Sequence, residues 1–155
     1  MSSARGRANH GLYLARILLS AWREALARQE LPALVLAQAF HPAARNHLLD
    51  AYGWFLLALS QADPLPVTPP HSCAQVPPAP QGKVLAGEIN ELRQLETGGW
   101  LGAMLQEPTF ASQGSQRQGS LARVVSDQPD PEQVEHWLEH LAELFDRMGD
   151  SLDEY

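Results

Sequence analysis

"AARNHLLDAYGWFLLAL", residues 43–59, is the stretch that decides the fold. Its apolar residues recur at intervals of three and four, which is the period of an amphipathic helix. A second stripe, made of His47, Trp54 and Ala58, adjoins the first. An apolar arc this wide is typical of a helix that contacts two or more neighbours, so we expect the central helix of a bundle here. Its main predicted buried face is Ala44, Leu48, Ala51, Tyr52, Phe55 and Leu59.

This central helix extends upstream in the sequence pattern. We expect it to begin at Leu31-Pro32, with the proline near the first helical position, and to end near Gln61. His41-Pro42 falls inside it. Proline removes one backbone donor and crowds the preceding turn, so the pattern predicts a kink or a short break there.

Two more amphipathic helices are predicted near the ends of the chain. The first runs from about Asn9, as N-cap, to about Gln29. The last begins with Asp130 as N-cap and Pro131 at the first helical position, and it is expected to fray at Gly149. Their predicted buried faces are Gly11, Leu14, Ala15, Leu18, Ala21, Trp22, Ala25 and Leu26, and then Val134, Trp137, Leu138, Leu141, Leu144, Phe145 and Met148.

A third helix is predicted to start near Lys83 or Val84, with Leu85, Ile89, Leu92, Leu95 and Glu96 along its face. Thr97-Gly98-Gly99 should break it, because paired glycines are unfavourable inside a helix, and a short helix over 100–106 follows.

The predicted helices are joined by segments without helical period. Residues 63–82 hold seven prolines and predict a linker or polyproline-like strap. Residues 107–130 are rich in Gln, Ser, Gly and Pro and are expected to be mobile, and 150–155 form a loose acidic tail. No strand pattern is present. The chain is therefore expected to be a single all-α domain over 1–155, a bundle of roughly four helices.

Composition narrows the class of protein. The only cysteine, Cys73, leaves no partner for an intramolecular disulfide or a cysteine-based zinc site, which fits a reducing, cytoplasmic compartment. No uninterrupted apolar run reaches about 18 residues, so no membrane span is expected. Tyr13, Arg16 and Ser20 interrupt the apolar run near the N-terminus, which disfavours a signal peptide. The sequence predicts no cofactor.

Charge is unevenly distributed along the chain. The net charge is -7, with about +3 in residues 1–60, about -1 in 61–125 and about -9 in 126–155. So acidic a chain makes nucleic acid an unlikely partner by bulk electrostatics. The basic first helix is expected to pack beside the acidic last one.

Arg45, His47, Asp50 and Tyr52 are the most chemically suggestive group. On a helical wheel, Arg45 and Tyr52 lie about 60° and about 40° from Leu48, whereas His47 and Asp50 point elsewhere. The structural interpretation is a buried arginine paired with an acid of the last helix. The functional alternative is a ligand or phosphate site formed by Arg45, His47 and Tyr52.

Two other groups are weaker candidates. His136 and His140 are one helical turn apart and are the only candidate metal ligands, but the wheel places His136 on the solvent side, so no metal site is predicted. Cys73 lies two residues from His71, a pairing that resembles an activated thiol, yet within a linker we interpret it as a bystander.

Three stretches resemble an uncharacterised bacterial family, domain of unknown function 6586. They are NHGLYLARILLSAWREAL, NHLLDAYGWFLLAL and INELRQLETGGWLGAMLQE. The resemblance covers about 1–107 and implies a short, all-helical, cytosolic bacterial protein without a known activity. The residues that carry it are Asn9, Tyr13, His47, Leu48, Tyr52, Glu91, Leu92, Leu95, Trp100 and Leu101.

Together these patterns favour a non-enzymatic protein that binds another protein or forms a homodimer. The first alternative is the ligand site at Arg45, His47 and Tyr52. The second is a nucleic-acid role, which requires Arg5, Arg7, Arg16, Arg23 and Arg28 to form one exposed patch that the last helix leaves unneutralised.

Overall fold

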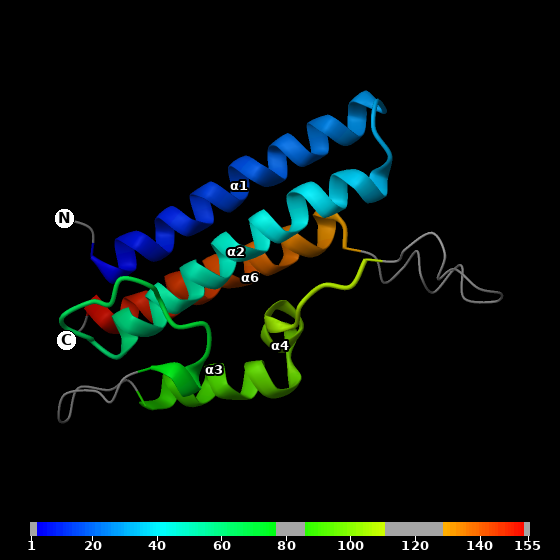
Figure 1. The fold of residues 1–155 in the computed structure, drawn as a ribbon. Coiled ribbons are helices and arrows are strands. Elements are labelled where there is room, and N and C mark those ends of the chain that lie inside the picture. The colour runs from blue at the N-terminus through cyan, green and yellow to red at the C-terminus, as the bar shows by residue number, and fades with distance from the viewer. Residues whose placement is uncertain (1–2, 77–85, 111–128, 154–155) are drawn as a thin grey trace.

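The computed structural model describes residues 3–76, 86–110 and 129–153. Within these ranges the chain forms α-helices, one 3-10 turn and no strand, so the all-α prediction is confirmed (Figure 1). The elements are α1 (Ala4–Arg28), α2 (Ala33–Leu59), the turn η1 (Cys73–Gln75), α3 (Ala86–Gly98), α4 (Trp100–Leu105) and α6 (Pro131–Asp153).

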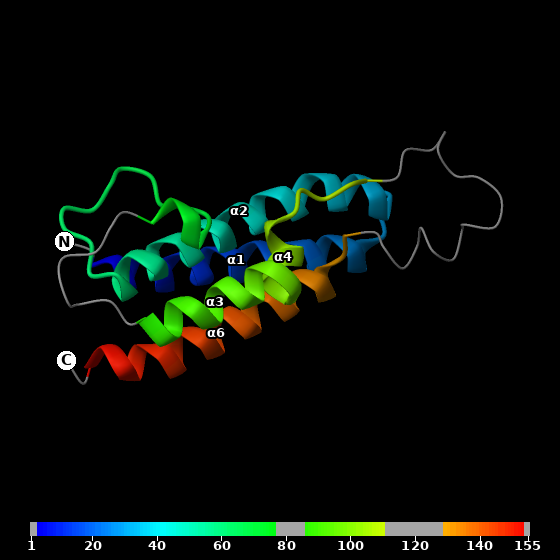
Figure 2. The same cartoon turned by 90° about the horizontal axis from the view of Figure 1, so that it is seen from below.

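The three long helices α1, α2 and α6 pack against one another in pairs. Helices α3 and α4 lie on the other side of α2 from α1, as Figures 1 and 2 show from two directions. The described ends of α1 and α6 meet at the same end of the molecule, where Arg5 Nη1 donates to the Gly149 carbonyl at 3.5 Å.

Helix α2 is the central helix that the sequence predicts. All six residues of its predicted main face are buried, and the adjoining His47, Trp54 and Ala58 are partly buried. The predicted break at Pro42 is wrong, because α2 runs through it without interruption. Burial of Ala37, His41 and Ala44 on both sides of the proline offsets the backbone bond that it removes.

Helix α1 begins one and a half turns earlier than predicted. Its N-cap is Ser3, whose Oγ accepts a hydrogen bond from the Gly6 amide at 3.0 Å, so Asn9 lies inside the helix. Its buried face is also rotated: Leu12 and Leu19 are buried, whereas Leu14 and Leu18 are only partly buried. The rotation follows from α1 contacting α6 as well as α2.

Helix α6 follows its sequence closely. Asp130 Oδ1 accepts from the Gln133 amide at 2.9 Å, as expected of an N-cap, and all seven predicted core residues are buried. The predicted fraying at Gly149 is wrong, because Arg5 covers this glycine and the helix continues to Asp153. Of the predicted loose tail, 150–153 are therefore helical, and 154–155 lie outside the described residues.

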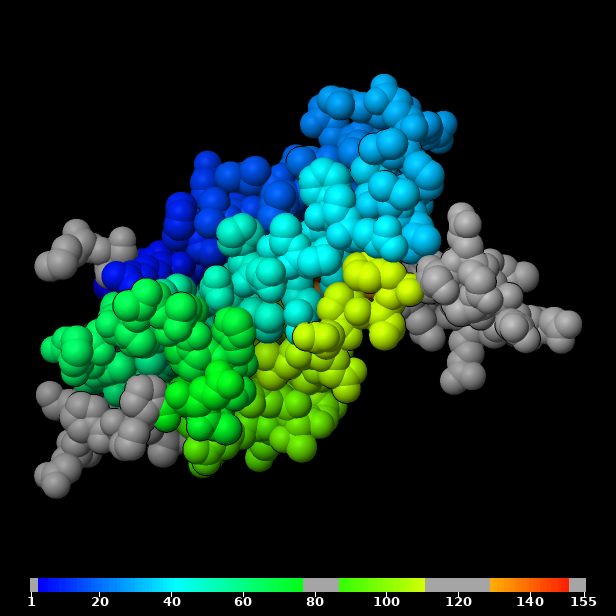
Figure 3. Space-filling view, in the orientation of Figure 1, coloured from blue at the N-terminus to red at the C-terminus, as the bar shows by residue number. Residues whose placement is uncertain are grey.

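Residues 60–76 include the described part of the predicted strap and are called the strap from here on. They lie against α2 (Figure 3). It crosses at Gly53, where an added Cβ would overlap the Pro70 carbonyl oxygen and lie 2.9 Å from the Pro69 Cβ. The rest of the predicted linker (77–82), the predicted start of the third helix (Lys83 to Leu85) and 111–128 of the predicted mobile segment lie outside the described residues. The predicted interruption at Gly99 and the short helix after it are confirmed.

None of the helices, over the residues that the structure describes, is long and apolar enough to cross a membrane.

Candidate functional site

Arg45 is buried between α2 and α4. Its Nε donates to the Met104 carbonyl and its Nη2 to the Leu105 carbonyl, both at 2.8 Å. These carbonyls belong to the last turn of α4, where backbone acceptors lack partners within the helix and a cation is favoured. The prediction that Arg45 pairs with an acid from the last helix is therefore wrong. Burial lowers the pKa of Arg45, which nevertheless remains charged because an arginine starts from so high a value.

Tyr52 lies on the same side of α2, two turns further along, within a second polar cluster. Its hydroxyl donates to Glu96 of α3, and the Cys73 amide donates to the same carboxylate oxygen at 2.9 Å. The Cys73 Sγ lies 3.6 Å from the Tyr52 hydroxyl. One carboxylate thus joins α2, α3 and the strap. Burial is the main cause that raises the pKa of Tyr52, so its hydroxyl remains a hydrogen-bond donor.

Cys73 is not an activated thiol, as the sequence suggests, but it is packed into the molecule. It is 5% exposed and belongs to the hydrophobic core. Burial raises the pKa of its thiol to about 11, so the thiol is protonated and unreactive near neutral pH. His71 does not activate it, because His71 Nε2 pairs with Asp50 Oδ1 at 3.0 Å.

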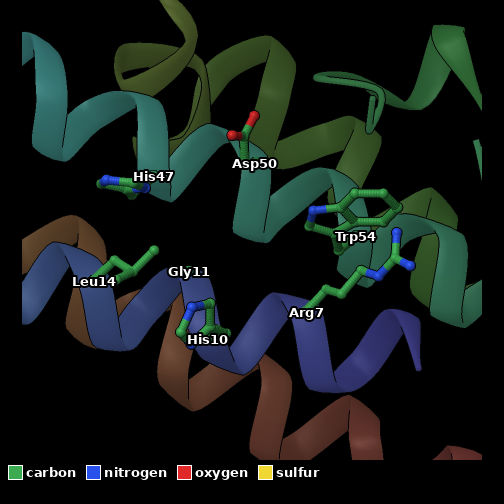
Figure 4. Close-up of a pocket in the computed structure, with 7 residues that line it drawn as sticks. All are labelled: Arg7, His10, Gly11, Leu14, His47, Asp50 and Trp54. Atoms are coloured by element: carbon green, nitrogen blue, oxygen red, sulfur yellow. The ribbon is translucent and has the colours of Figure 1, made fainter. Parts of the chain in front are cut away.

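His47 lies elsewhere, in a groove between α1 and α2. We call this the α1–α2 groove, and it has a volume of about 190 Å³. Figure 4 shows its lining side chains on the two helices, with Asp50 pointing away from α1. The lining residues are Arg7, His10, Gly11, Leu14, His47, Asp50 and Trp54.

The predicted trio of Arg45, His47 and Tyr52 therefore does not form one site. Arg45 bonds to α4 and Tyr52 bonds to α3, while His47 lines a groove against α1. A separate surface cavity of about 410 Å³ includes Arg45 and His71 but neither His47 nor Tyr52.

The role of His41, which lies in the interior of the bundle, was not predicted from the sequence. It is fully buried, and its Nε2 lies 2.9 Å from the Gln133 Oε1 of α6. Because that amide oxygen only accepts, Nε2 carries the proton, and the buried Nδ1 has no hydrogen-bond partner among the described residues. The signal was its position: His41 precedes Ala44 and Leu48 by three and seven residues. The rings around it are Trp22, Phe110 and Trp137.

His136 and His140 stack on each other with ring centres 6.3 Å apart, and His140 also stacks on Trp100 at 5.0 Å. Over the described residues, no group of three or more His, Cys, Asp or Glu side chains is arranged to hold a metal ion. The aromatic stacking accounts for the position of His140.

The arginines of α1 do not make one free patch. Arg23 bonds to Glu132 at 3.1 Å and to Glu135 at 2.5 Å, both on α6. The pairing raises the pKa of Arg23 and lowers that of Glu135. The basic first helix therefore packs beside the acidic last one, as the charge distribution predicts, and the condition for the nucleic-acid alternative is not met.

The sequence of the chain matches a known protein family. A family model described as a family of unknown function (DUF6586) matches residues 1–155. The chain belongs to this family. The match to DUF6586 spans the whole chain, so it extends beyond the 1–107 that the three stretches suggest, over the last helix as well. No match was found among the curated proteins or among the solved structures.

Proposed function

We propose that this DUF6586 protein is a non-enzymatic helical protein that binds a partner protein through the outer face of α1. The observation that carries the proposal is a pair of exposed large apolar residues one helical turn apart. Tyr13 is 57% exposed and Ile17 is 49% exposed. Figure 1 shows no other described segment on the side of α1 that faces away from α2 and α6.

The spacing on α1 suits a helical partner. Helices that pack against each other make contact through residues at i, i+3, i+4 and i+7 of one face, and His10, Tyr13 and Ile17 have this spacing. His10 stacks on Tyr13 with ring centres 6.2 Å apart, which extends the aromatic surface. Aromatic side chains are enriched among the residues that contribute most to binding.

Charge favours an acidic partner segment. Residues 4–23 contain four arginines and no acid. Arg5 and Arg23 contact α6 within the molecule, whereas Arg16 is exposed beside the apolar pair. We therefore commit to an amphipathic segment of another protein, with apolar anchors for Tyr13 and Ile17 and acidic residues that face Arg16.

The contacts of the candidate catalytic residues support a non-enzymatic role. Arg45 and Tyr52 each use their polar atoms to join helices, and the Cys73 thiol is protonated in the core. The proposal includes a cytoplasmic location in a bacterium. The single free cysteine and the resemblance to a cytosolic bacterial family support it.

The test is capture from a bacterial lysate with a photo-crosslinking residue at position 20, on the edge of this face. Wild type is compared with the double variant Tyr13→Ser, Ile17→Ser. The matched control is Leu31→Ser, Val35→Ser, which removes the other exposed apolar pair at the same spacing.

We expect one partner, cross-linked through an acidic amphipathic peptide, whose capture falls more than tenfold in the first double variant and is unchanged in the control. Its capture should also weaken as salt rises. Equal capture by both double variants would overturn the proposal. If the protein cross-linked only to a second copy of itself and sedimented as a dimer, the face would be a homodimer interface and not a site for another protein.

A further inference from the structure

The α1–α2 groove is a candidate ligand site that shares only His10 with the proposed docking face. The groove exists because the two helices approach closely at Gly11. A Cβ there would lie 2.9 Å from the Ala51 Cβ and 3.0 Å from the His47 carbonyl oxygen. The larger side chains around Gly11 line an open groove with a volume of about 190 Å³ (Figure 4). That volume accommodates a small organic molecule rather than only a few waters.

The lining of the groove is rich in nitrogen. Arg7 and His10 come from α1, and His47 comes from α2. The only acid in the lining is Asp50, whose carboxylate pairs with His71 of the strap at 3.0 Å. Figure 4 shows this carboxylate directed away from α1. The part of the groove between the helices is therefore lined by cationic and neutral groups, which favours an anion.

Arg7 is held in place without using its hydrogen-bond donors. Its guanidinium carbon lies 4.6 Å from the centre of the Trp54 ring, in a cation–π contact. Within the described part of the chain, no salt bridge or hydrogen bond occupies this guanidinium. An arginine fork that is oriented by an aromatic ring and has free N–H groups suits a planar carboxylate, which it contacts through two parallel bonds.

The remaining walls are apolar. Leu14 and Trp54 stand on opposite sides of Gly11, which has no side chain. We propose that the α1–α2 groove binds a small organic carboxylate with a flat apolar body. Arg7 contacts the carboxylate at the Trp54 end of the groove, and the body lies over Gly11 between Leu14 and Trp54, with His10 and His47 along its sides (Figure 4).

Benzoate is a suitable probe, and benzamide is its uncharged counterpart of nearly the same shape. We would titrate each into the full-length protein and follow backbone amide signals by NMR, with inorganic phosphate as a third ligand. We expect saturable shifts at Gly11, His47 and Trp54 with benzoate. Benzamide and phosphate should bind at least tenfold more weakly, because one lacks the charge and the other lacks the apolar body.

Variants separate the groove from general charge effects. Arg7→Gln should weaken benzoate binding at least tenfold, whereas Arg16→Gln, on the same helix but outside the groove, should leave it unchanged. Should Arg7→Gln lose helical structure by circular dichroism, His47→Gln is the second test, with an expected severalfold loss. Equal binding of benzoate and benzamide, no saturable shift, or unchanged affinity in the folded groove variant would overturn the proposal.

The outcome is separable from that of the proposed function. The Tyr13→Ser, Ile17→Ser variant removes the docking residues but none of the groove lining, so it should bind benzoate as wild type does. Loss of partner capture with intact benzoate binding leaves the groove assignment standing, and the reverse result leaves the docking face standing.

Discussion

The two sides of α2 are packed in different ways. On one side, α1 and α6 contact α2 through apolar side chains, among them Trp22, Phe55 and Phe145, with the two phenylalanine rings stacked at 4.2 Å. On the other side, α3 and α4 also bury apolar residues in the core, among them Leu92, Leu101 and Met104. Individual polar bonds then add to the attachment of α3, α4 and the strap to α2. Arg45 bonds to the end of α4, and Tyr52 bonds to Glu96.

The two sides of α2 differ in the kind of interaction that fixes the position of the neighbouring helices. Apolar burial is non-directional and tolerates small rotations, so α1 can turn its face by part of a turn without losing the contact. Hydrogen bonds are directional and costly when left unmade in the interior, so the α3–α4 side depends on a few particular atoms. We therefore expect single substitutions of these polar residues to weaken the attachment of the strap, α3 and α4 to α2.

The largest effect is expected at Gly53, where the strap crosses α2. Gly53→Ala adds a Cβ that would overlap the Pro70 carbonyl oxygen, which is backbone and must move. Overpacking of this kind should lower the free energy of unfolding by about 2–3 kcal/mol, measured by urea denaturation. It should also increase amide hydrogen exchange in residues 71–76.

Gly87→Ala is the matched control, because nothing lies within 4 Å of its added Cβ and it also lies in a helix. That variant should gain up to about 1 kcal/mol from helix propensity. If Gly53→Ala were as stable as wild type, the strap would not be packed on α2 as described.

The next largest effect is expected at Arg45. Arg45→Met preserves much of the aliphatic volume but leaves the Met104 and Leu105 carbonyls without their donor. Hydrogen bonds from a charged group of this kind contribute about 2 kcal/mol, which urea denaturation would report as lost stability. Arg93→Met, at an exposed position of α3, should change stability by no more than about 0.5 kcal/mol. Similar losses of stability in the two variants would mean that the hydrogen bonds from Arg45 to α4 contribute nothing to stability.

A third prediction concerns His41, on the side of α2 that contacts α1 and α6, and the pH dependence of stability. Burial is the main cause that lowers its pKa, while Gln133 and Asp130 act in the opposite direction and Arg45 lowers it further. Between that lowered pKa and the unfolded value of about 6.5, the unfolded chain binds more protons than the folded one. Stability should therefore be fully present above about pH 6.5 and fall as the pH drops below it, by at most about 1.4 kcal/mol per pH unit.

The measurement for His41 is the slope of unfolding free energy against pH between 5 and 7. His41→Phe should flatten this slope, even though it also lowers stability by removing the bond to Gln133. An unchanged slope in His41→Phe would contradict the assignment.

The smallest effect is expected at Tyr52. Tyr52→Phe removes one donor to Glu96, but the Cys73 amide still donates to that carboxylate, so the loss should be about 1 kcal/mol. A double-mutant cycle with Glu96→Gln measures the coupling between the two side chains. Tyr13→Phe, at an exposed tyrosine, should be neutral. Additive effects in the cycle would show that the pair is not energetically coupled.

The comparison between the two sides of α2 also explains which expectations succeeded. The faces of α2 and α6 repeat at helical spacing, so the predicted core residues of both are buried. The ends were less predictable: helix α1 begins at Ala4 because the Ser3 hydroxyl caps it, and α6 continues past Gly149, where Arg5 contacts it. Such ends depend on one hydrogen bond or one contact between segments remote in sequence.

The candidate site was less accessible to sequence reasoning than the fold. Arg45, His47 and Tyr52 are close in sequence, yet their polar atoms serve three different neighbours. The α1–α2 groove instead joins His47 to Arg7 and His10, about forty residues away in the chain. No periodicity within α2 reveals which helix will face its second stripe.

By itself, the sequence determined the helical class, the central place of α2 and the apolar faces of α2 and α6, because burial at regular spacing is a local property of the chain. Only the tertiary structure decided that Arg45 would satisfy the end of α4 rather than an acid, and that Glu96 would join Tyr52 to the strap. The tertiary structure also decided that α1 and α2 would approach closely at Gly11, and that the strap and α2 would do so at Gly53. These outcomes depend on directional bonds and steric fit between distant segments, and neither leaves a repeating signal in the sequence.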